Sequence, residues 1–503
     1  MRDDSIVWSG ADGTVLDLLL QVLQAFRREV VSYCYWKSTR RVHEVLCGAA
    51  DLDLLIGKND QHRAQKILLD CGLKLCPAVA ARDHPAIVSF LGYDEPSGRI
   101  VHLHLHFRLI LGERLLKNYR LPWEATLLAG AITHPTMPLR TLDPASEAVL
   151  LATRACLELR WLDPVTLRGW AGTINKFERD REELARQVDR KALRGRAAAL
   201  LGEDLADGVV EAIFGEKPLE KQRHFRRLVR KRMAVFRTYN AVEARLRSVG
   251  RAAFWLAGGL NKRFTHKPRP WSRRAPGGGS VIAVVGVDGS GKTTTVVCVR
   301  EWLGAELDVM PIYFGTGGGR PTLLLLPLKL LVPLAMRLFA SKPQGSSHGA
   351  VSNRRPGMAY SVFLAVWATV LAVEKRLKLN AARRGADRGL VVIADRYPQD
   401  EIADFNDGPL LPRLAYVPRR LRQFEAAAYA LARRLPPDLV LRLEASPETI
   451  AAREPDMAPA VVRERTTALQ RLTFPGAKIV RVDAEQPLAD MIRAVKREIW
   501  QVL

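Results

Sequence analysis

The sequence has few cysteines, and none of them has metal-binding spacing. The six cysteines stand at positions 34, 47, 71, 76, 156 and 298. Even the closest pair, Cys71 and Cys76, has four residues between its members, where a CxxC motif has two. A zinc knuckle is therefore not indicated, and we interpret the cysteines as reduced thiols of a cytosolic protein.

The first residues also lack the pattern of a secretory signal. Met1-Arg2-Asp3-Asp4-Ser5 contains no basic region followed by an apolar core, which such a signal requires. We therefore expect a cytoplasmic protein. Peripheral attachment to a membrane stays open as an alternative, because of the next two features.

One leucine-rich run, residues 322–339, has nearly the length of a membrane span, but it contains two prolines together with Lys329 and Arg337. A charge near the bilayer centre costs about 3 kcal/mol on insertion scales, so this segment is not expected to span a membrane. Two alternatives remain, an interfacial segment or a buried element that lines an acceptor site.

Acidic residues are nearly absent from one stretch of a chain whose formal net charge is +24. Residues 221–274 contain seventeen Lys or Arg and a single acid, Glu243, which gives +16 by subtraction. Apolar residues from Phe225 to Tyr239 recur at three- and four-residue spacing, which predicts an amphipathic helix with a cationic face. We expect this segment to meet an anion, which could be nucleic acid, membrane headgroups or a polyphosphorylated substrate, with a solvated helix as the alternative.

The most specific pattern lies further along the chain. Residues 286–293 read Gly-Val-Asp-Gly-Ser-Gly-Lys-Thr and follow the strand-like apolar run 281–285. This is a phosphate-binding loop in its expected context, because glycines let backbone N–H groups wrap a triphosphate. Lys292 is expected to reach the phosphates, and the Thr293 hydroxyl to bind Mg²⁺. The residues predicted to bind ATP are Gly286, Asp288, Gly289, Ser290, Gly291, Lys292, Thr293 and Thr294.

Composition divides the chain into several parts. A length of 503 residues favours roughly two to four domains. Residues 265–280 are rich in Pro, Gly and basic residues and read as a linker. We predict a mixed domain over 1–140, a basic helical domain over 141–264 with helix caps at Asp143 and Asp163, and an α/β domain over 281–503.

The last domain resembles the thymidylate kinase family, one of the P-loop nucleoside monophosphate kinases. Three motifs carry the resemblance in order: the loop at 286–294, Val-Val-Ile-Ala-Asp-Arg-Tyr at 391–397, and Pro-Asp-Leu-Val-Leu-Arg-Leu at 437–443. The resemblance implies a doubly wound parallel sheet, with the functional groups at the carboxyl ends of the strands. It also implies an ATP- and Mg²⁺-dependent phosphotransferase.

Roles follow for the residues that match. Lys292 and Arg396 would bind phosphate, and Asp395 would hold Mg²⁺ with Thr293. The family's lid supplies arginines to the transition state. Arg453, Arg463 and Arg465 occupy that region, with Arg453 as the first choice, so the predicted catalytic residues are Lys292, Asp395, Arg396 and Arg453.

The acceptor pattern differs from that family. Its Arg-Glu-Pro-Gly motif is absent, and residues 314–320 read Phe-Gly-Thr-Gly-Gly-Gly-Arg in that region. We therefore expect a phosphorylated small-molecule acceptor, with a nucleotide as the best class and a glycan precursor as a further alternative. No pattern predicts the oligomeric state.

The amino-terminal region resembles the nucleotidyltransferase superfamily. Tyr-Trp-Lys-Ser at 35–38 stands where that superfamily has a Gly-Ser turn, and Asp51 and Asp53 form an Asp-x-Asp strand pattern. Alternation puts both carboxylates on one face of a strand, where they can share divalent ions. We expect an α+β domain whose metal ligands are Asp51 and Asp53.

A histidine stands where the third carboxylate of that superfamily belongs. His102, His104 and His106 alternate along a second predicted strand. They would either bind a metal together with the two aspartates or form hydrogen bonds within the core. Whether this domain transfers nucleotides or only senses them is left open.

Two other functions fit the same patterns. A nucleic-acid end-processing protein would hold its substrate on the basic segment, and its binding would depend steeply on salt. A membrane-surface regulator would bind ATP without phosphoryl transfer.

Overall fold

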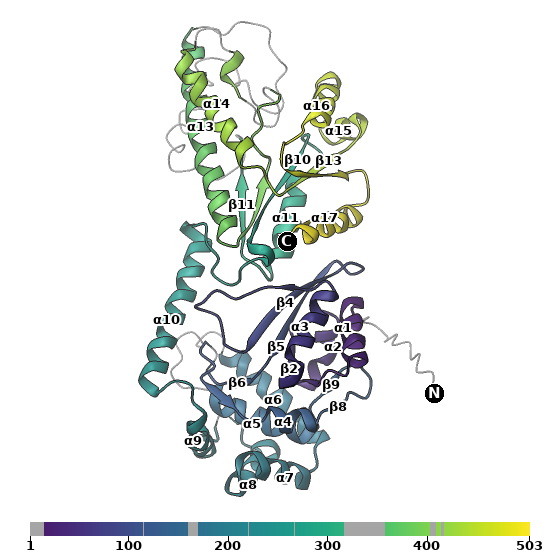
Figure 1. Ribbon diagram of the computed structural model, residues 1–503, viewed down its shortest axis with the longest axis vertical. Helices are drawn as coiled ribbons and strands as arrows, with labels where there is room; N and C mark the ends of the chain where they lie inside the picture. Colours follow the sequence, from purple (N-terminus) through teal and green to yellow (C-terminus); the bar gives the residue numbers. More distant parts are fainter. Residues whose placement is uncertain are drawn as a thin grey trace, which may run out of the picture. The chain divides into compact units, whose positions relative to one another are not determined.

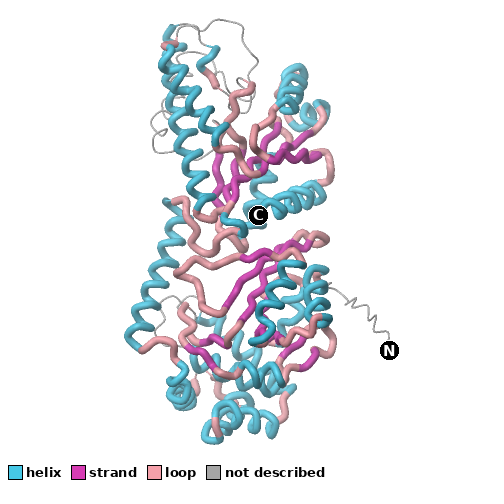
Figure 2. The backbone as a smooth tube through the Cα atoms, viewed as in Figure 1, coloured by secondary structure: helices cyan, strands magenta, loops and turns pink. Residues whose placement is uncertain are grey.

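The computed structural model describes residues 15–113, 115–158, 170–219, 221–265, 267–315, 358–402, 409–413 and 417–503. They fall into two compact units, Met1–Thr265 and His266–Leu503. Helices and strands alternate along most of the second unit, whereas the first combines a sheet with a group of helices (Figures 1 and 2). The chain is therefore an α/β protein with mixed and parallel sheets.

The first unit contains a seven-stranded mixed sheet with the order β3-β4-β5-β2-β1-β9-β8. The strands are β1 Tyr33–Tyr35, β2 Leu52–Ile56, β3 Lys74–Leu75, β4 Ile87–Asp94, β5 Arg99–His106, β8 Ile132–Thr133 and β9 Arg140–Thr141. Strands β2 and β5 are parallel neighbours, and Asp53 pairs with His104. A separate hairpin joins β6 Leu109–Leu111 to β7 Tyr119–Leu121.

Short helices accompany this sheet. They are α1 Asp17–Arg28, α2 Val42–Leu46, α3 Gln61–Asp70 and α4 Glu124–Ala129. In α1, Leu19, Val22 and Phe26 recur at helical spacing and are fully buried, which is the pattern of a helix with one apolar face. This face contributes to the core under the sheet.

A second group of helices forms a separate core in the same unit. Its members are α5 Pro144–Glu158, α6 Trp170–Gln187, α7 Arg190–Leu201, α8 Glu203–Phe214, α9 Arg223–Arg232 and α10 Ala241–Leu260. Helix α5 is buried along most of its length and contacts α6, α7, α8 and α9. The predicted cap is confirmed, since Asp143 Oδ1 accepts a hydrogen bond from the Ser146 amide at 2.9 Å.

The prediction of one amphipathic helix from Phe225 to Tyr239 is wrong in its extent. Helix α9 ends at Arg232, one 3₁₀ turn follows, and Arg237 is extended. Asn118 accounts for the break, because its carbonyl and side-chain oxygens accept hydrogen bonds from the Thr238 and Tyr239 amides. A tertiary contact thus ends a helix that the apolar spacing would continue.

The second unit contains a five-stranded sheet in which all strands are parallel, with the order β11-β12-β10-β13-β14. The strands are β10 Ser280–Gly286, β11 Val309–Tyr313, β12 Val391–Asp395, β13 Leu439–Glu444 and β14 Lys478–Asp483. The apolar runs at 281–285, 391–395 and 439–443 are thus confirmed as strands. Strand β10 is buried throughout, as expected for a central parallel strand.

Helices cover this sheet in two groups. They are α11 Lys292–Gly304, α13 Met358–Asp387, α14 Arg419–Arg434, α15 Pro447–Arg453, α16 Pro459–Arg471 and α17 Leu488–Val502. Helix α11 packs with α17, and α13 packs with α14. The connection from β10 to β11 crosses the sheet in one direction, and the connection from β11 to β12 crosses it in the opposite direction. Since parallel crossovers are right-handed, the two groups lie on opposite faces (Figure 1).

Three sequence predictions fall outside the described residues. They concern the apolar segment 322–339, most of the glycine-rich segment 314–320 and the region around Asp163. The six cysteines form no disulfide among the residues described. In the described part of the chain, no helix has the length and apolar character that crossing a bilayer requires.

Candidate functional site

A glycine-rich loop follows β10 and leads directly into α11. A Cβ atom at Gly286 would lie 2.3 Å from Ser290 Oγ and 3.1 Å from the Leu443 carbonyl oxygen, so only glycine fits there. Gly289 and Gly291 have φ values of 83° and 88°, in the left-handed region that other residues rarely adopt. The strand, loop and helix predicted from the sequence are therefore present.

Lys292 is the first residue of α11 and lies inside the loop. Its Nζ donates a hydrogen bond to the Val287 carbonyl at 2.9 Å and lies 3.2 Å from Asp288 Oδ1. Burial lowers the pKa of Lys292, because the low-dielectric surroundings disfavour the ammonium form. The next two residues, Thr293 and Thr294, are exposed at the first turn of the helix.

Three cationic side chains converge on Asp288. Besides Lys292, Arg396 donates a hydrogen bond to Asp288 Oδ1 at 2.9 Å, and Arg465 lies 3.7 Å from Oδ2. Burial alone would raise the pKa of Asp288, but the charges of Lys292 and Arg396 outweigh it and lower that pKa below its usual value. The cluster therefore has three positively charged side chains around one carboxylate and a net positive charge.

Asp395 and Arg396 end the neighbouring strand, β12. Val284 of β10 pairs with Asp395, so the two strands deliver the glycine-rich loop and these side chains to one edge of the sheet. Arg396 has a φ of 66°, which is unusual for a residue with a side chain and is typical of functional sites. Ser290 adds a buried hydroxyl whose Oγ has no hydrogen-bond partner within the described part of the chain.

The arginines of the predicted lid have different positions. Arg453, the first choice from the sequence, donates to the carbonyls of Gly289 at 3.3 Å and Ala484 at 3.0 Å. Arg463 is exposed on α16. Arg465, two residues later on the same helix, is the one that approaches Asp288, and spacing alone gave no reason to prefer it.

A pocket of about 260 Å³ lies elsewhere in this unit. It is lined by Tyr397 to Glu401, by α14, and by residues 436–437 and 473–475. Residues 397–401 follow the carboxyl end of β12, whereas the last two segments precede β13 and β14. The cationic side chains Lys292, Arg396 and Arg465 gather at the glycine-rich loop and do not line this pocket.

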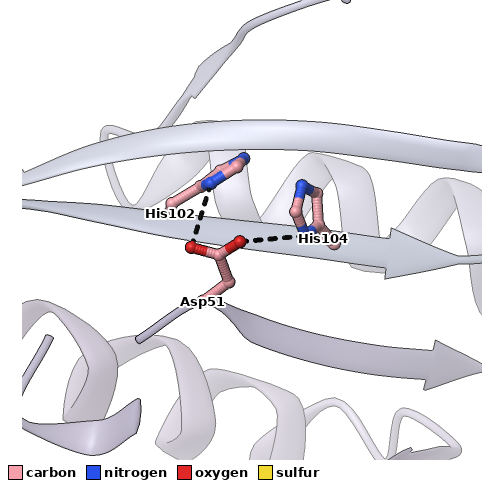
Figure 3. A group of neighbouring side chains, drawn as sticks. All are labelled: Asp51, His102 and His104. Atoms are coloured by element: carbon pink, nitrogen blue, oxygen red, sulfur yellow. Dashed lines mark ion pairs between the residues drawn. The ribbon is translucent and has the colours of Figure 1, made fainter. Parts of the chain in front are cut away.

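The predicted aspartates and histidines of the first unit come together across the parallel pair β2 and β5. His102 Nδ1 lies 3.3 Å from Asp51 Oδ1, and His104 Nδ1 lies 3.9 Å from Asp51 Oδ2. Figure 3 shows both rings turned toward the Asp51 carboxylate. The strand alternation expected from the sequence is therefore present.

Asp53 is buried beside this group. Lys37 Nζ lies 2.5 Å from its Oδ2, and its Oδ1 lies 3.0 Å from His106 Nε2 and 3.3 Å from His104 Nδ1. Burial alone would raise the pKa of Asp53, but the Lys37 charge and the histidine hydrogen bonds hold it well below the usual value. Burial lowers the pKa of His106 to about 3, so this ring is neutral near pH 7.

Aromatic and basic side chains surround Asp53. The Trp36 and His106 rings lie 4.9 Å apart, and the Arg154 guanidinium lies 5.5 Å from the Trp36 ring centroid. Burial, with the nearby charge of Lys37, lowers the pKa of Lys117 to about 8. Lys117 and Arg154 were not predicted from the sequence, because they come from a hairpin and a helix far along the chain.

Fold and site define an α/β protein with a glycine-rich loop at the carboxyl edge of a parallel sheet. No family model matches the chain. It is 30% identical over 228 residues, 44% of this chain and 93% of the relative, to the "Uncharacterized ATP-binding protein YghS" of Escherichia coli (strain K12). It is 26% identical over 227 residues, 44% of this chain and 86% of the relative, to the "Uncharacterized ATP-binding protein YghR" of the same strain. Through the 228 residues that match YghS, the chain belongs to the family of that protein.

Proposed function

We propose that the second unit is an ATP- and Mg²⁺-dependent phosphotransferase of the thymidylate kinase type. The observation that carries this proposal is the convergence of Lys292, Arg396 and Arg465 on one carboxylate beside the glycine-rich loop. A site that holds a carboxylate with three cations suits a phosphoryl group equally well. The relatives YghS and YghR are both named as ATP-binding proteins, which supports ATP as the nucleotide.

ATP would lie on the amino end of α11. The loop backbone approaches closely because positions 286, 289 and 291 carry no Cβ, and the helix dipole favours negative charge at that end. Lys292 would exchange its contact with Asp288 for the β- and γ-phosphates. The buried Ser290 hydroxyl offers a further hydrogen bond.

The residues near the loop also fit Mg²⁺. The Asp395 carboxylate ends β12 beside β10, and the Thr293 hydroxyl is exposed at the first turn of α11. Both provide oxygen ligands, which Mg²⁺ prefers, and they would hold the ion. The ion would neutralise charge on the triphosphate.

Transfer needs positioning and charge neutralisation more than covalent chemistry. The bond between the γ-phosphorus and the ADP oxygen breaks, and an oxygen of the acceptor forms the new bond to phosphorus. Arg396 and Arg465 would stabilise the charge on the transferred group, and Arg453 would fix the loop through Gly289. Arg465 therefore replaces Arg453 as our choice for direct contact with phosphate.

We propose a nucleoside monophosphate as the first acceptor to test, and a phosphorylated glycan precursor as the second. The missing Arg-Glu-Pro-Gly motif argues against dTMP itself. For the first unit, we propose a nucleotidyltransferase-like domain. Its Asp53 is buried and ion-paired to Lys37, so we expect this domain to bind a nucleotide and not to turn it over rapidly.

The test is transfer of labelled γ-phosphate from ATP with Mg²⁺ to nucleoside monophosphates, oligonucleotide ends and phosphosugars. Lys292→Ala should abolish transfer, whereas Lys478→Ala, at a surface ion pair with Glu498, should not change it. Arg465→Ala should lower kcat by about 10²- to 10³-fold, and Arg463→Ala on the same helix should not.

Three results would contradict the proposal. If Lys292→Ala and the unmodified protein had equal activity, the glycine-rich loop would be excluded as the site of transfer. ATP binding without transfer to any acceptor in the panel would favour the regulatory protein, and labelled oligonucleotide ends would favour nucleic-acid end processing.

A further inference from the structure

We propose that Asp51, His102 and His104 form a binding site for one divalent transition-metal ion in the first unit. This site is separate from the proposed Mg²⁺ position, since it lies in the other unit. It does not depend on phosphoryl transfer by the second unit.

The geometry brings three donors to one point. One ligand atom from each of the three side chains lies within 4.8 Å of the other two. Atoms bound at about 2.1 Å to one ion lie roughly 3 to 4 Å apart when they occupy adjacent positions. The 3.3 Å between His102 Nδ1 and Asp51 Oδ1 matches that spacing, and side-chain rotations would bring the ligand atom of His104 from within 4.8 Å to the same distance.

The backbone fixes this arrangement. His102 and His104 are two residues apart on β5 and therefore lie on the same face of the strand. Asp51 directly precedes β2, whose Leu52 pairs with Leu103, so its carboxylate lies between the two rings, as Figure 3 shows. The site is built on paired strands, which hold ligands more precisely than a loop does.

The donor set selects the kind of ion. Two imidazoles and one carboxylate suit zinc, cobalt, iron or nickel, whereas Mg²⁺ and Ca²⁺ prefer oxygen donors alone. Three protein ligands also leave at least one position open for water or a substrate oxygen, as in catalytic zinc sites. The Asp51 side chain is 47% exposed, which gives an ion a route from solvent.

Asp53 has the position of an orienting carboxylate. Its Oδ1 lies 3.3 Å from His104 Nδ1, and Lys37 and His106 hold Asp53 itself in place. A metal-binding histidine typically donates the N–H of its other ring nitrogen to a carboxylate, which fixes the ring and its tautomer. With Nδ1 on Asp53, His104 would bind the ion through Nε2. Asp53 would thus be a positioning residue, and Asp51 a ligand.

The probe is Co²⁺, titrated into the full-length protein after treatment with a chelator and without nucleotide. We expect one ion per chain, with a visible ligand-field absorption that a similar amount of Zn²⁺ removes and an excess of Mg²⁺ does not. Asp51→Asn, His102→Gln and His104→Gln should each lose the absorption. His62→Gln, which changes an exposed histidine of the same unit, should keep it.

Further variants keep the test decisive. Asp53→Asn should weaken Co²⁺ binding by about 10- to 100-fold while keeping one ion per chain. Circular dichroism checks folding, and the half-exposed Asp51→Asn serves if a buried histidine variant does not fold. The absence of Co²⁺ binding in the unmodified protein, or unchanged binding in Asp51→Asn and His104→Gln, would show that the cluster is only a histidine–carboxylate hydrogen-bond network.

Discussion

At the scale of single residues, the glycine-rich loop and the Asp51–histidine cluster each contain a buried carboxylate whose pKa depends on its cationic neighbours. Asp288 and Asp53 are carboxylates whose pKa burial would raise, and in both cases neighbouring cations reverse the shift. Removing one partner of such a pair leaves an uncompensated charge, which costs more than the pair contributes. A substitution here therefore tests function only when folding is measured as well.

Glu147 is a buried carboxylate without a cationic partner of this kind, and it gives a pH prediction. Its Oε1 accepts a hydrogen bond from the Thr39 amide at 3.0 Å, and its Oε2 has no hydrogen-bond partner in the described ranges. Burial raises the pKa of Glu147 to about 7. The folded state therefore binds a proton that the unfolded state releases near pH 4.5, and stability falls as pH rises from about 4.5 to 7.

Glu147→Gln should remove this loss, because an amide keeps the acceptor for Thr39 and carries no charge. We expect the variant to be more stable than the unmodified protein at pH 8, by on the order of 1 to 3 kcal/mol, and to show no such gain at pH 4.5. Urea unfolding of both proteins at the two pH values measures the difference. An equal difference at both values would contradict the burial argument.

At the scale of elements, α10 has an unusual distribution of side chains. Ala244 and Gly258 are buried, and Arg251, between them, donates to the Asp83 and Leu115 carbonyls. On the opposite face lies an apolar row at helical spacing: Val242, Leu246, Val249, Leu256 and Leu260, all exposed. Such a row, next to the cationic α9, favours a lipid surface over nucleic acid among the anionic partners predicted for residues 221–274.

We therefore predict binding to vesicles that contain anionic lipid and weak binding to neutral ones. Replacing Leu246, Val249 and Leu256 together by serine should weaken the binding at least tenfold, since each removes buried apolar area. Leu69→Ser, an exposed leucine of α3, is the matched control. Flotation of vesicles measures both. Unchanged binding of the triple variant, or salt-dependent binding of nucleic acid alone, would contradict this assignment.

At the scale of the whole molecule, the chain forms two compact units, and we propose a different ligand for each. Within the predicted linker, residues 265–280, the described residues from 267 onward belong to the second unit, where the Trp271 and Ser272 amides donate to Asp308. Residues 141–264 belong to the first unit together with its sheet. The structure therefore divides into two compact units, where composition predicted three domains.

Each ligand should then stabilise one unit. A ligand at 100 times its Kd adds about 2.7 kcal/mol to the unit that binds it. Calorimetry of the full-length protein should give two transitions, with ATP and Mg²⁺ raising the Tm of one and Co²⁺ raising the Tm of the other. A single transition that both ligands raise would show that the units unfold together.

The sequence by itself determined the glycine-rich loop, the parallel strands that frame it, and the alternation that puts Asp51, His102 and His104 on one face. These features are local, because glycine conformations and strand periodicity depend on neighbouring residues. Only the tertiary structure decided that Arg465 rather than Arg453 approaches Asp288, that Asn118 ends α9, and that Lys37 neutralises Asp53. Each of these depends on contacts between residues far apart in the chain, which no local pattern encodes.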